Sequence, residues 1–237
     1  MPATRSSRFA VLWSLLRLAT AVALLAAIIA QFTTSVSSAA AQGRDVGTTI
    51  ANFFSFFTIL SNLLAAIVLL CAAVWFFTRG RDAAAEPRSL AVALASVSTY
   101  MIVTGIVYNA LLRGIPLLPG TEVVGWSNET LHLVGPILLL LDVLLGPRRR
   151  RLRWRGILAV IAFPILWVVY TLVRAPLTTN PVTGDPWWYP YPFLNPHLQP
   201  WGYGGVALYV AGIAIVIAGI AWFVVWVGRW RGIAPGA

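Results

Sequence analysis

The chain has 237 residues, of which 59% are apolar and only 10% carry a charge. A soluble domain usually has about 45–50% apolar and about 25% charged residues, and a disordered chain is more polar still. The composition therefore excludes both classes and favours an integral membrane protein. The net charge of +10 comes from arginines that stand between apolar segments, which is typical of a membrane topology signal rather than of nucleic-acid binding.

Six apolar segments are long enough to cross a bilayer, because a helix of about 20 residues spans its hydrocarbon core. They cover approximately residues 9–31, 52–78, 90–112, 128–145, 156–173 and 203–227. None shows the strict two-residue alternation of a barrel strand, so helices are expected. The sequence thus predicts an all-α integral membrane protein, with residues 1–237 forming a single transmembrane domain and a six-transmembrane helix bundle.

Arginine is distributed unequally between the two sides of this bundle. Thirteen arginines lie before span 1, between spans 2 and 3, between spans 4 and 5 or after span 6, and three lie on the other side. Cytoplasmic loops carry the excess of basic residues, so both termini are expected in the cytoplasm. Arg17, near the start of span 1, is expected to snorkel towards the surface.

The arginine-rich and lysine-free composition points to a bacterial protein, and hence to a multi-pass protein of the bacterial plasma membrane. The segment Ser38-Ala39-Ala40-Ala41 resembles the cleavage site of a signal peptide. The apolar run before it is too long for an ordinary signal peptide, so an uncleaved first span is favoured.

Polar side chains inside a membrane span are costly, which makes their positions informative. On a continuous helix, Ser55, Thr58 and Asn62 of span 2 would fall within a sector of about 60°. Serine and threonine often bond to carbonyls of their own helix or hold helices together, without any further function. Asn62 requires an external partner more strongly, because its amide both donates and accepts.

His132 in span 4 is the only histidine inside any span, and it follows Asn128 by four residues. A lone histidine at such a position is more often structural than catalytic. Asp142 lies about 15 Å further along the helix. It is too distant to orient the imidazole and is expected to pair with an arginine near the inner surface. Tyr100 and Tyr108 of span 3 are expected to line the same interior.

The loop over residues 174–202 is rich in proline and aromatic residues. Its prolines prevent a long helix, while tryptophan and tyrosine favour membrane interfaces. We interpret it as a rigid aromatic cap, with Tyr189, Tyr191 and Phe193, beside the outer ends of spans 2, 3 and 4. A simple aromatic belt is the alternative. His197 of the same loop is a further residue that can reach this region.

Several familiar motifs are missing from the chain. There is no Gly-Xaa-Ser-Xaa-Gly motif, no phosphate-binding glycine loop and no His-Glu-Xaa-Xaa-His pair. Two histidines and one cysteine make no persuasive metal site, and no second histidine lies in a span to ligate haem. We therefore expect no metal, no cofactor and no nucleic-acid partner.

Four segments carry a resemblance to a known family: Phe56–Asn62, Thr104–Asn109, Asn128–His132 with Pro136, and Tyr189–Pro196. Through them the chain resembles the superfamily of androgen-induced and androgen-dependent TFPI-regulating membrane hydrolases, and more closely its bacterial six-span branch. The resemblance extends from about span 2 to span 6. The Tyr-Pro-Tyr-Pro-Phe sequence is the part most specific to the bacterial branch.

Eukaryotic members of this superfamily are threonine hydrolases that cleave esters of fatty acids with hydroxy fatty acids. The resemblance implies that Thr58 is the nucleophile and His132 the general base. The eukaryotic motif has histidine where this chain has Glu129, and threonine where it has Leu133. Candidates for lining the cavity or stabilising an oxyanion are Asn62, Asn128, Ser55 and Tyr108.

Three hypotheses follow. The first is an intramembrane hydrolase of fatty-acyl lipid esters, whose substrate is a lipid or amphipathic ester in the bilayer. The second is a non-enzymatic six-span transporter or a receptor for a lipid or other small molecule, which would use the same outer-leaflet polar cavity. The third is a structural or assembly protein whose polar residues merely join helices. Turnover that depends on Thr58 and His132 would distinguish the first from the others.

Overall fold

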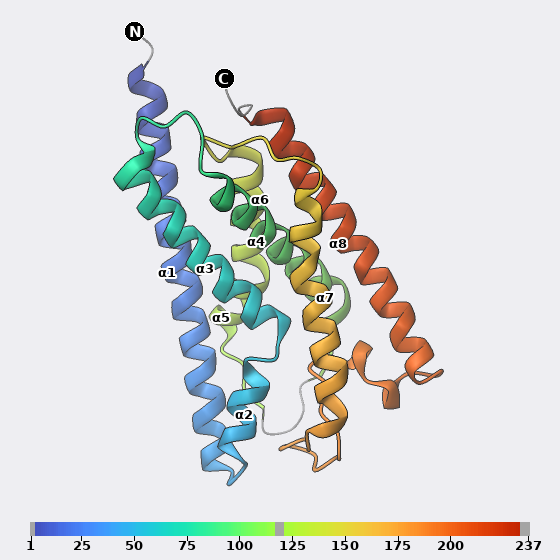
Figure 1. Ribbon diagram of the computed structural model, residues 1–237. Coiled ribbons are helices and arrows are strands. Elements are labelled where there is room, and N and C mark those ends of the chain that lie inside the picture. The colour runs from blue at the N-terminus through green and yellow to red at the C-terminus, as the bar shows by residue number, and fades with distance from the viewer. Residues whose placement is uncertain (1–2, 117–120, 233–237) are drawn as a thin grey trace.

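The computed structural model describes residues 3–116 and 121–232, which form an all-helical bundle (Figure 1). Six helices within these residues are long and apolar enough to cross a membrane: Arg8–Ala41, Phe57–Gly80, Arg88–Leu112, Gly125–Leu145, Gly156–Leu177 and Tyr203–Arg231. The six predicted spans are thereby confirmed. The start of α1 and the end of α8 lie at one end of the bundle, which we call the terminus end, and residues 178–202 lie at the other, which we call the cap end (Figure 1).

Several of these spans are composites of shorter elements. α1 (Ala3–Ala41) and the short α2 (Val46–Phe53) precede α3 (Phe57–Trp75), which continues into a π-helical turn, η1 (Phe76–Gly80). α4 (Arg88–Val107) continues likewise into η2 (Tyr108–Leu112). The fourth span joins α5 (Gly125–Glu129), η3 (Thr130–Val134) and α6 (Gly135–Leu145). α7 (Gly156–Arg174) and α8 (Tyr203–Arg231) are connected by the cap loop, which contains the short 3₁₀ turns η4 (Ala175–Leu177), η5 (Pro192–Leu194) and η6 (Pro196–Leu198).

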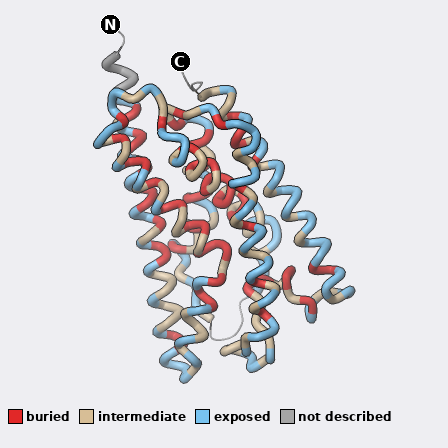
Figure 2. Tube along the Cα trace, in the orientation of Figure 1, coloured by how far each residue is buried: buried red, intermediate tan, exposed pale blue. Residues whose placement is uncertain are grey.

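α4 lies at the centre of the bundle, where it contacts α3, α6, α7 and α8. Its apolar stretch is 61% buried, compared with 17% for α7 and 22% for α8. Figure 2 shows the same contrast between the buried inner helices and the exposed outer pair. The side chains exposed on α7 and α8 are largely apolar, such as Leu166 and Ile215. An apolar exterior is what a hydrocarbon solvent requires.

Two glycines allow the fourth span to approach its neighbours closely. A Cβ at Gly105 of α4 would lie 2.8 Å from Cβ of Pro136, and a Cβ at Gly135 would lie 2.8 Å from Cε of Met101. Small residues permit such close contacts between membrane helices. The contact fixes α4 directly against the helix that carries His132.

The second span departs from the prediction of one continuous helix. α2 ends at Phe53, Phe56 has an extended backbone with φ −70° and ψ 129°, and α3 begins at Phe57. The break is visible between α2 and α3 in Figure 1. The predicted polar stripe is therefore wrong in one respect, because Ser55 does not share a helix with Thr58. No proline or glycine marks this break; instead, Trp167 Nε1 donates to the carbonyl of Ser55 at 3.0 Å.

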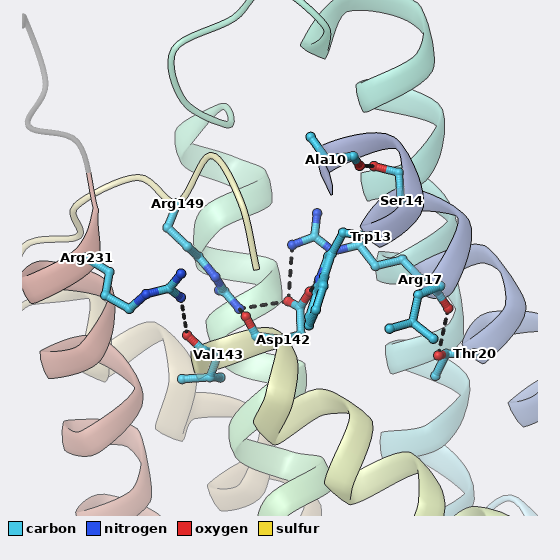
Figure 3. Close-up of polar contacts among 10 residues, drawn as sticks. Ala10, Trp13, Ser14, Arg17, Thr20, Asp142, Val143, Arg149 and Arg231 are labelled. Carbon is cyan, nitrogen blue, oxygen red and sulfur yellow. Dashed lines mark hydrogen bonds and ion pairs between the residues drawn. The ribbon is translucent and has the colours of Figure 1, made fainter. Parts of the chain in front are cut away.

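A cluster of buried charges joins α1 to the fourth span at the terminus end (Figure 3). Asp142 accepts hydrogen bonds from Trp13 Nε1 at 2.6 Å, Arg17 Nε at 2.7 Å and Arg149 Nη2 at 2.7 Å. The predicted pairing of Asp142 with an arginine is confirmed. The prediction that Arg17 snorkels is wrong, because its side chain is only 4% exposed and turns inward to this carboxylate.

Candidate functional site

The hydroxyl of Thr58 bonds to groups outside its own helix. A helical threonine usually donates to the carbonyl four residues earlier, as Thr99 does to Ala95 at 2.9 Å. For Thr58 that position is Phe54, which lies outside α3. The hydroxyl instead lies 3.3 Å from His132 Nε2 and 3.3 Å from the hydroxyl of Tyr191. The break before α3 thus explains why this threonine faces other elements.

His132 is held in a defined tautomer. Its Nδ1 lies 2.9 Å from the carbonyl oxygen of Asn128. A carbonyl only accepts, so Nδ1 carries the proton and Nε2 presents its lone pair to Thr58. The ring also stacks on Tyr108, with centroids 3.7 Å apart. Both the orientation and the tautomer suit a general base acting on the Thr58 hydroxyl.

The π-helical turn η3 places His132, and two amides hold its backbone. The N–H of Gly135 bonds to the carbonyl of Thr130, five residues earlier, which breaks the ordinary α-helical pattern. Asn62 Nδ2 donates to the carbonyl of Leu131 at 3.3 Å, and Asn109 Nδ2 donates to the carbonyl of His132 at 3.1 Å. π-helical turns inside helices occur frequently at functional sites.

Tyr191 brings the cap loop onto the start of α3. Its hydroxyl oxygen accepts a hydrogen bond from the backbone N–H of Thr58 at 3.2 Å. This N–H belongs to the first turn of the helix, where no helical carbonyl is available to it. The ring stacks on Phe193 and contacts the edge of Phe56, with centroids 5.2 and 5.7 Å away. Burial raises the pKa of the Tyr191 phenol, which therefore stays protonated at neutral pH.

A cavity of about 160 Å³ opens beside Thr58. Its hydroxyl groups come from Thr58, Thr104, Tyr108 and Tyr191. The rest of the wall is almost wholly apolar and is built by α4, α7, α8 and the cap loop, including Val107, Ile165, Phe193, Ile213 and Ala214. Its volume is comparable to that of an engineered cavity of about 150 Å³ that stays dry and binds benzene. The cavity therefore suits a hydrocarbon group whose polar end meets the hydroxyls.

The remaining predicted site residues of the spans are Asn62, Asn128 and Ser55, and they do not line the cavity. Asn62 Nδ2 donates to the carbonyl of Thr58 at 2.8 Å, and Asn128 Nδ2 donates to the Tyr108 hydroxyl at 2.6 Å. Both amides are therefore engaged in holding neighbours. Ser55 does not line the cavity: it donates to the carbonyl of Ala51 at 2.8 Å and bonds to the Tyr170 hydroxyl at 3.0 Å.

Other predicted residues lie apart from Thr58. The hydroxyl of Tyr189 bonds to that of Tyr203 at 3.0 Å, while His197 stacks on Trp187 with centroids 3.7 Å apart. Neither Tyr189 nor His197 lines the cavity. Tyr100, expected beside Tyr108, instead donates to the carbonyl of Val160 at 2.8 Å. The positions of these residues in the sequence do not distinguish them from residues such as Tyr108 and Tyr191, which do lie at the site.

Three contacts of Arg113 near the site were not anticipated. Arg113 forms a bidentate ion pair with Glu129, with both distances 2.9 Å, and its Nε donates to Asn109 Oδ1 at 2.7 Å. The guanidinium also lies 5.5 Å from the ring centroid of Tyr108. This pair joins the end of η2 to α5. In the sequence, the only indication of these contacts is that Asn109 follows Tyr108 directly.

Comparison with known proteins yields no identification: no protein-family model, no curated protein and no solved structure matches the chain. Within residues 3–116 and 121–232, no group of three or more His, Cys, Asp or Glu side chains is placed to hold a metal ion. A function must therefore be argued from the chemistry of Thr58, His132 and their neighbours.

Proposed function

We propose that this protein is an intramembrane hydrolase of fatty-acyl lipid esters, with Thr58 as the nucleophile and His132 as the general base. The observation that carries the proposal is the 3.3 Å approach of Thr58 Oγ1 to His132 Nε2, with Nδ1 of the same ring held by the Asn128 carbonyl. A nucleophile, a base and a group that orients the base form the arrangement by which hydroxyl nucleophiles are activated. The distance is slightly longer than the roughly 2.6–3.2 Å of a formed catalytic hydrogen bond, and such contacts commonly tighten when substrate binds.

The chemistry follows from these positions. Thr58 Oγ1 attacks the ester carbonyl carbon while its proton passes to His132 Nε2. Collapse of the tetrahedral intermediate breaks the bond to the alcohol oxygen, which takes the proton from His132 and leaves. Water then gives a proton to His132 and attacks the acyl-threonine. When this second intermediate collapses, Thr58 recovers its proton and the fatty acid is released.

The cavity supports an acyl chain as the part of the substrate that is bound. Its wall offers hydroxyls only beside Thr58 and along Tyr108 and Thr104, and side chains such as Val107 and Ile213 elsewhere. Burying each methylene of a chain there is worth about 0.8 kcal/mol. An ester whose acyl chain fills the cavity would place its carbonyl near Thr58.

We further propose that the terminus end faces the cytoplasm of a bacterial cell and that the cap end faces outward. The arginine excess supports this orientation, because the segments with thirteen arginines adjoin the terminus end. The site would then draw its substrate from the outer leaflet of the plasma membrane.

The test uses purified full-length protein in detergent and a fluorophosphonate probe, which reacts with activated hydroxyls. Wild type is compared with Thr58→Ala, Thr58→Ser, His132→Gln and the control Thr99→Ala. Thr99 is a buried threonine whose hydroxyl bonds within its own helix. We expect labelling of wild type, Thr58→Ser and Thr99→Ala, with the adduct mapped to Thr58 by mass spectrometry. We expect none in Thr58→Ala and severe loss in His132→Gln, and the same pattern for release of fatty acid from long-chain esters.

Well-folded wild type that neither labels nor hydrolyses any acyl ester would overturn the hydrolase proposal. Ester or lipid that binds in the cavity without turnover would then support the alternative of a transporter or a receptor. Loss of labelling in His132→Gln must also be separated from loss of fold. The yield and the unfolding transition of each variant are therefore measured on the same preparation.

A further inference from the structure

We propose that Tyr191 of the cap loop is a third catalytic residue, whose phenol donates the hydrogen bond that stabilises the oxyanion formed when Thr58 attacks an ester. The inference rests on the proposed hydrolase function and adds the group that balances the charge generated in its first step. It also gives the cap loop a chemical role, since Tyr191 reaches the site from 133 positions away in the sequence.

The directions of the hydrogen bonds around Thr58 are fixed by the chemistry of their end groups. The backbone N–H of Thr58 can only donate, so the Tyr191 oxygen is its acceptor at 3.2 Å. His132 Nε2 can only accept in its Nδ1–H tautomer, so the Thr58 hydroxyl donates to it at 3.3 Å. The proton of Tyr191 is then directed to Thr58 Oγ1, also at 3.3 Å. A single chain of donors thus runs from Tyr191 through Thr58 to His132.

The Tyr191 phenol is also positioned to donate to the oxygen on which negative charge develops during the attack. In the tetrahedral intermediate, the oxyanion and Thr58 Oγ1 are bonded to the same carbon. A donor that reaches Oγ1 before the attack can therefore turn its O–H bond to an oxyanion that forms on the cavity side, where Tyr191 is part of the wall. The Thr58 hydroxyl has by then lost its proton to His132, and the carbonyl π electrons have moved onto the oxygen that Tyr191 stabilises. Tyr191 keeps its proton throughout, and the electron pair returns when the bond to the alcohol breaks.

Of the other predicted donors, the asparagine amides are committed to partners, and the ring of Tyr108 stacks on His132 rather than contacting Thr58. Asn62 Nδ2 donates to the carbonyls of Thr58 and Leu131, and Asn128 Nδ2 donates to the hydroxyl of Tyr108. Neither amide lines the cavity, whereas Tyr191 does. Among the predicted oxyanion candidates and the residues of the cap loop, Tyr191 alone combines a hydroxyl proton directed at the nucleophile with a place in the cavity wall.

The surroundings of Tyr191 hold its hydroxyl in place before the reaction. The ring is packed against Phe193, Phe56 and Trp167, with centroids 5.2, 5.7 and 6.0 Å away. Only 9% of the residue is exposed. A donor fixed in advance in such a dry setting loses little energy to reorganisation, which is the condition for effective oxyanion stabilisation. Burial also raises the phenol pKa, which keeps the donor protonated.

The decisive comparison is between Tyr191→Phe and Tyr100→Phe. Each removes one buried hydroxyl and retains an aromatic ring, but the Tyr100 hydroxyl bonds to the Val160 carbonyl and lies outside the cavity wall. We measure kcat and KM with a long-chain acyl ester in detergent micelles. Active sites are counted by the end point of fluorophosphonate labelling. For Tyr191→Phe we expect kcat per labelled site to fall by about 10²–10³-fold, the usual effect of losing one oxyanion donor, with KM little changed. Tyr100→Phe should match wild type.

A purely structural role for Tyr191, as the cap of α3, would predict fewer labelled sites with normal kcat per site. If Tyr191→Phe does not fold, replacement of Tyr191 by a fluorinated tyrosine, whose phenol is more acidic, provides the second test. It retains the ring and the hydroxyl, and the alkaline limb of kcat should shift to lower pH because the donor is lost earlier.

The outcomes separate this inference from the proposed function. Wild type that requires Thr58 and His132, together with a Tyr191→Phe variant of unchanged kcat per site, refutes the role of Tyr191 alone. Wild type without labelling or turnover refutes the hydrolase function and with it this role. An unshifted alkaline limb in a folded, active fluorotyrosine protein also counts against Tyr191 as the donor.

Discussion

Replacing Asp142 by asparagine tests the buried charge cluster that ties α1 to the fourth span. The substitution preserves the shape of the side chain and leaves an oxygen that can still accept from Trp13. It removes the only negative charge in direct contact with Arg17 and Arg149 in the described structure, whose side chains are 4% and 7% exposed. Two guanidinium groups would then remain buried next to a neutral amide (Figure 3).

The expected magnitude follows from burial and from the number of partners. Removing one member of a buried ion pair usually costs about 3–5 kcal/mol, because the charge left behind is neither solvated nor neutralised. Glu86 lies close enough to attract both arginines and compensates in part. We therefore expect Asp142→Asn to reduce the free energy of unfolding by about 3–4 kcal/mol. Arg17→Gln should cost less, because Arg149 still neutralises the carboxylate.

The assay is equilibrium unfolding in mixed micelles, in which SDS is titrated into the purified protein and helix content is followed. The control is Glu129→Gln, which breaks the ion pair with Arg113. Those two side chains are 41% and 43% exposed, and solvent screens their attraction, so no measurable loss is expected. The reasoning would be refuted if Asp142→Asn unfolded at the same SDS fraction as the control variant.

Three further predictions address stability and the cavity. Burial outweighs the attraction of Arg149 and Arg17 and raises the pKa of Glu86 above its ordinary value of 4.5, so the folded state holds this proton more tightly than the unfolded state does. Stability should therefore fall as pH rises from 4.5 through the folded pKa, and an SDS titration repeated across this range should find that dependence reduced in Glu86→Gln. Gly105→Ala places a methyl group 2.8 Å from Cβ of Pro136 and should lower the free energy of unfolding by about 1–3 kcal/mol through overpacking. The same SDS titration measures this loss. An unchanged midpoint would show that the two helices can move apart without cost. If the cavity binds the acyl chain, kcat/KM should rise about fourfold for each methylene added to the chain until the cavity is full. Ala214→Phe narrows the cavity and should end this rise at a shorter chain. A series of acyl esters of increasing length tests both predictions, and a kcat/KM that does not change with length would place the chain elsewhere.

The membrane character and the six spans were predictable because they depend on residue type summed over long segments. A bilayer requires about 20 apolar residues and a helix that satisfies its own backbone, and both conditions can be evaluated without tertiary structure. The pairing of Asp142 was predictable for a related reason. A carboxylate at this depth needs a cation, and arginines were the abundant basic residues nearby.

The same reasoning failed where the backbone leaves the regular helix. The break at Phe54–Phe56 carries no proline, whereas the π-helical turn η3 precedes Pro136, which has no N–H to donate to the carbonyl of His132. A 100° helical wheel extends straight through both deviations. Their irregular backbone is held by groups distant in the chain, including Trp167 on the carbonyl of Ser55 and Asn109 on that of His132. Pro136 indicates that the carbonyl of His132 is free, but local sequence does not tell which distant groups bond to the two freed carbonyls.

The sequence by itself therefore determined that this protein belongs in a bilayer, the number of its membrane spans and a short list of polar residues, including Thr58 and His132. Only the tertiary structure decided that these two side chains meet, that Tyr191 joins them and that Ser55, Tyr189 and His197 do not. The physical reason is that hydrogen bonds act over about 3 Å. Whether residues 74 and 133 positions apart come that close depends on how whole helices and the cap loop pack.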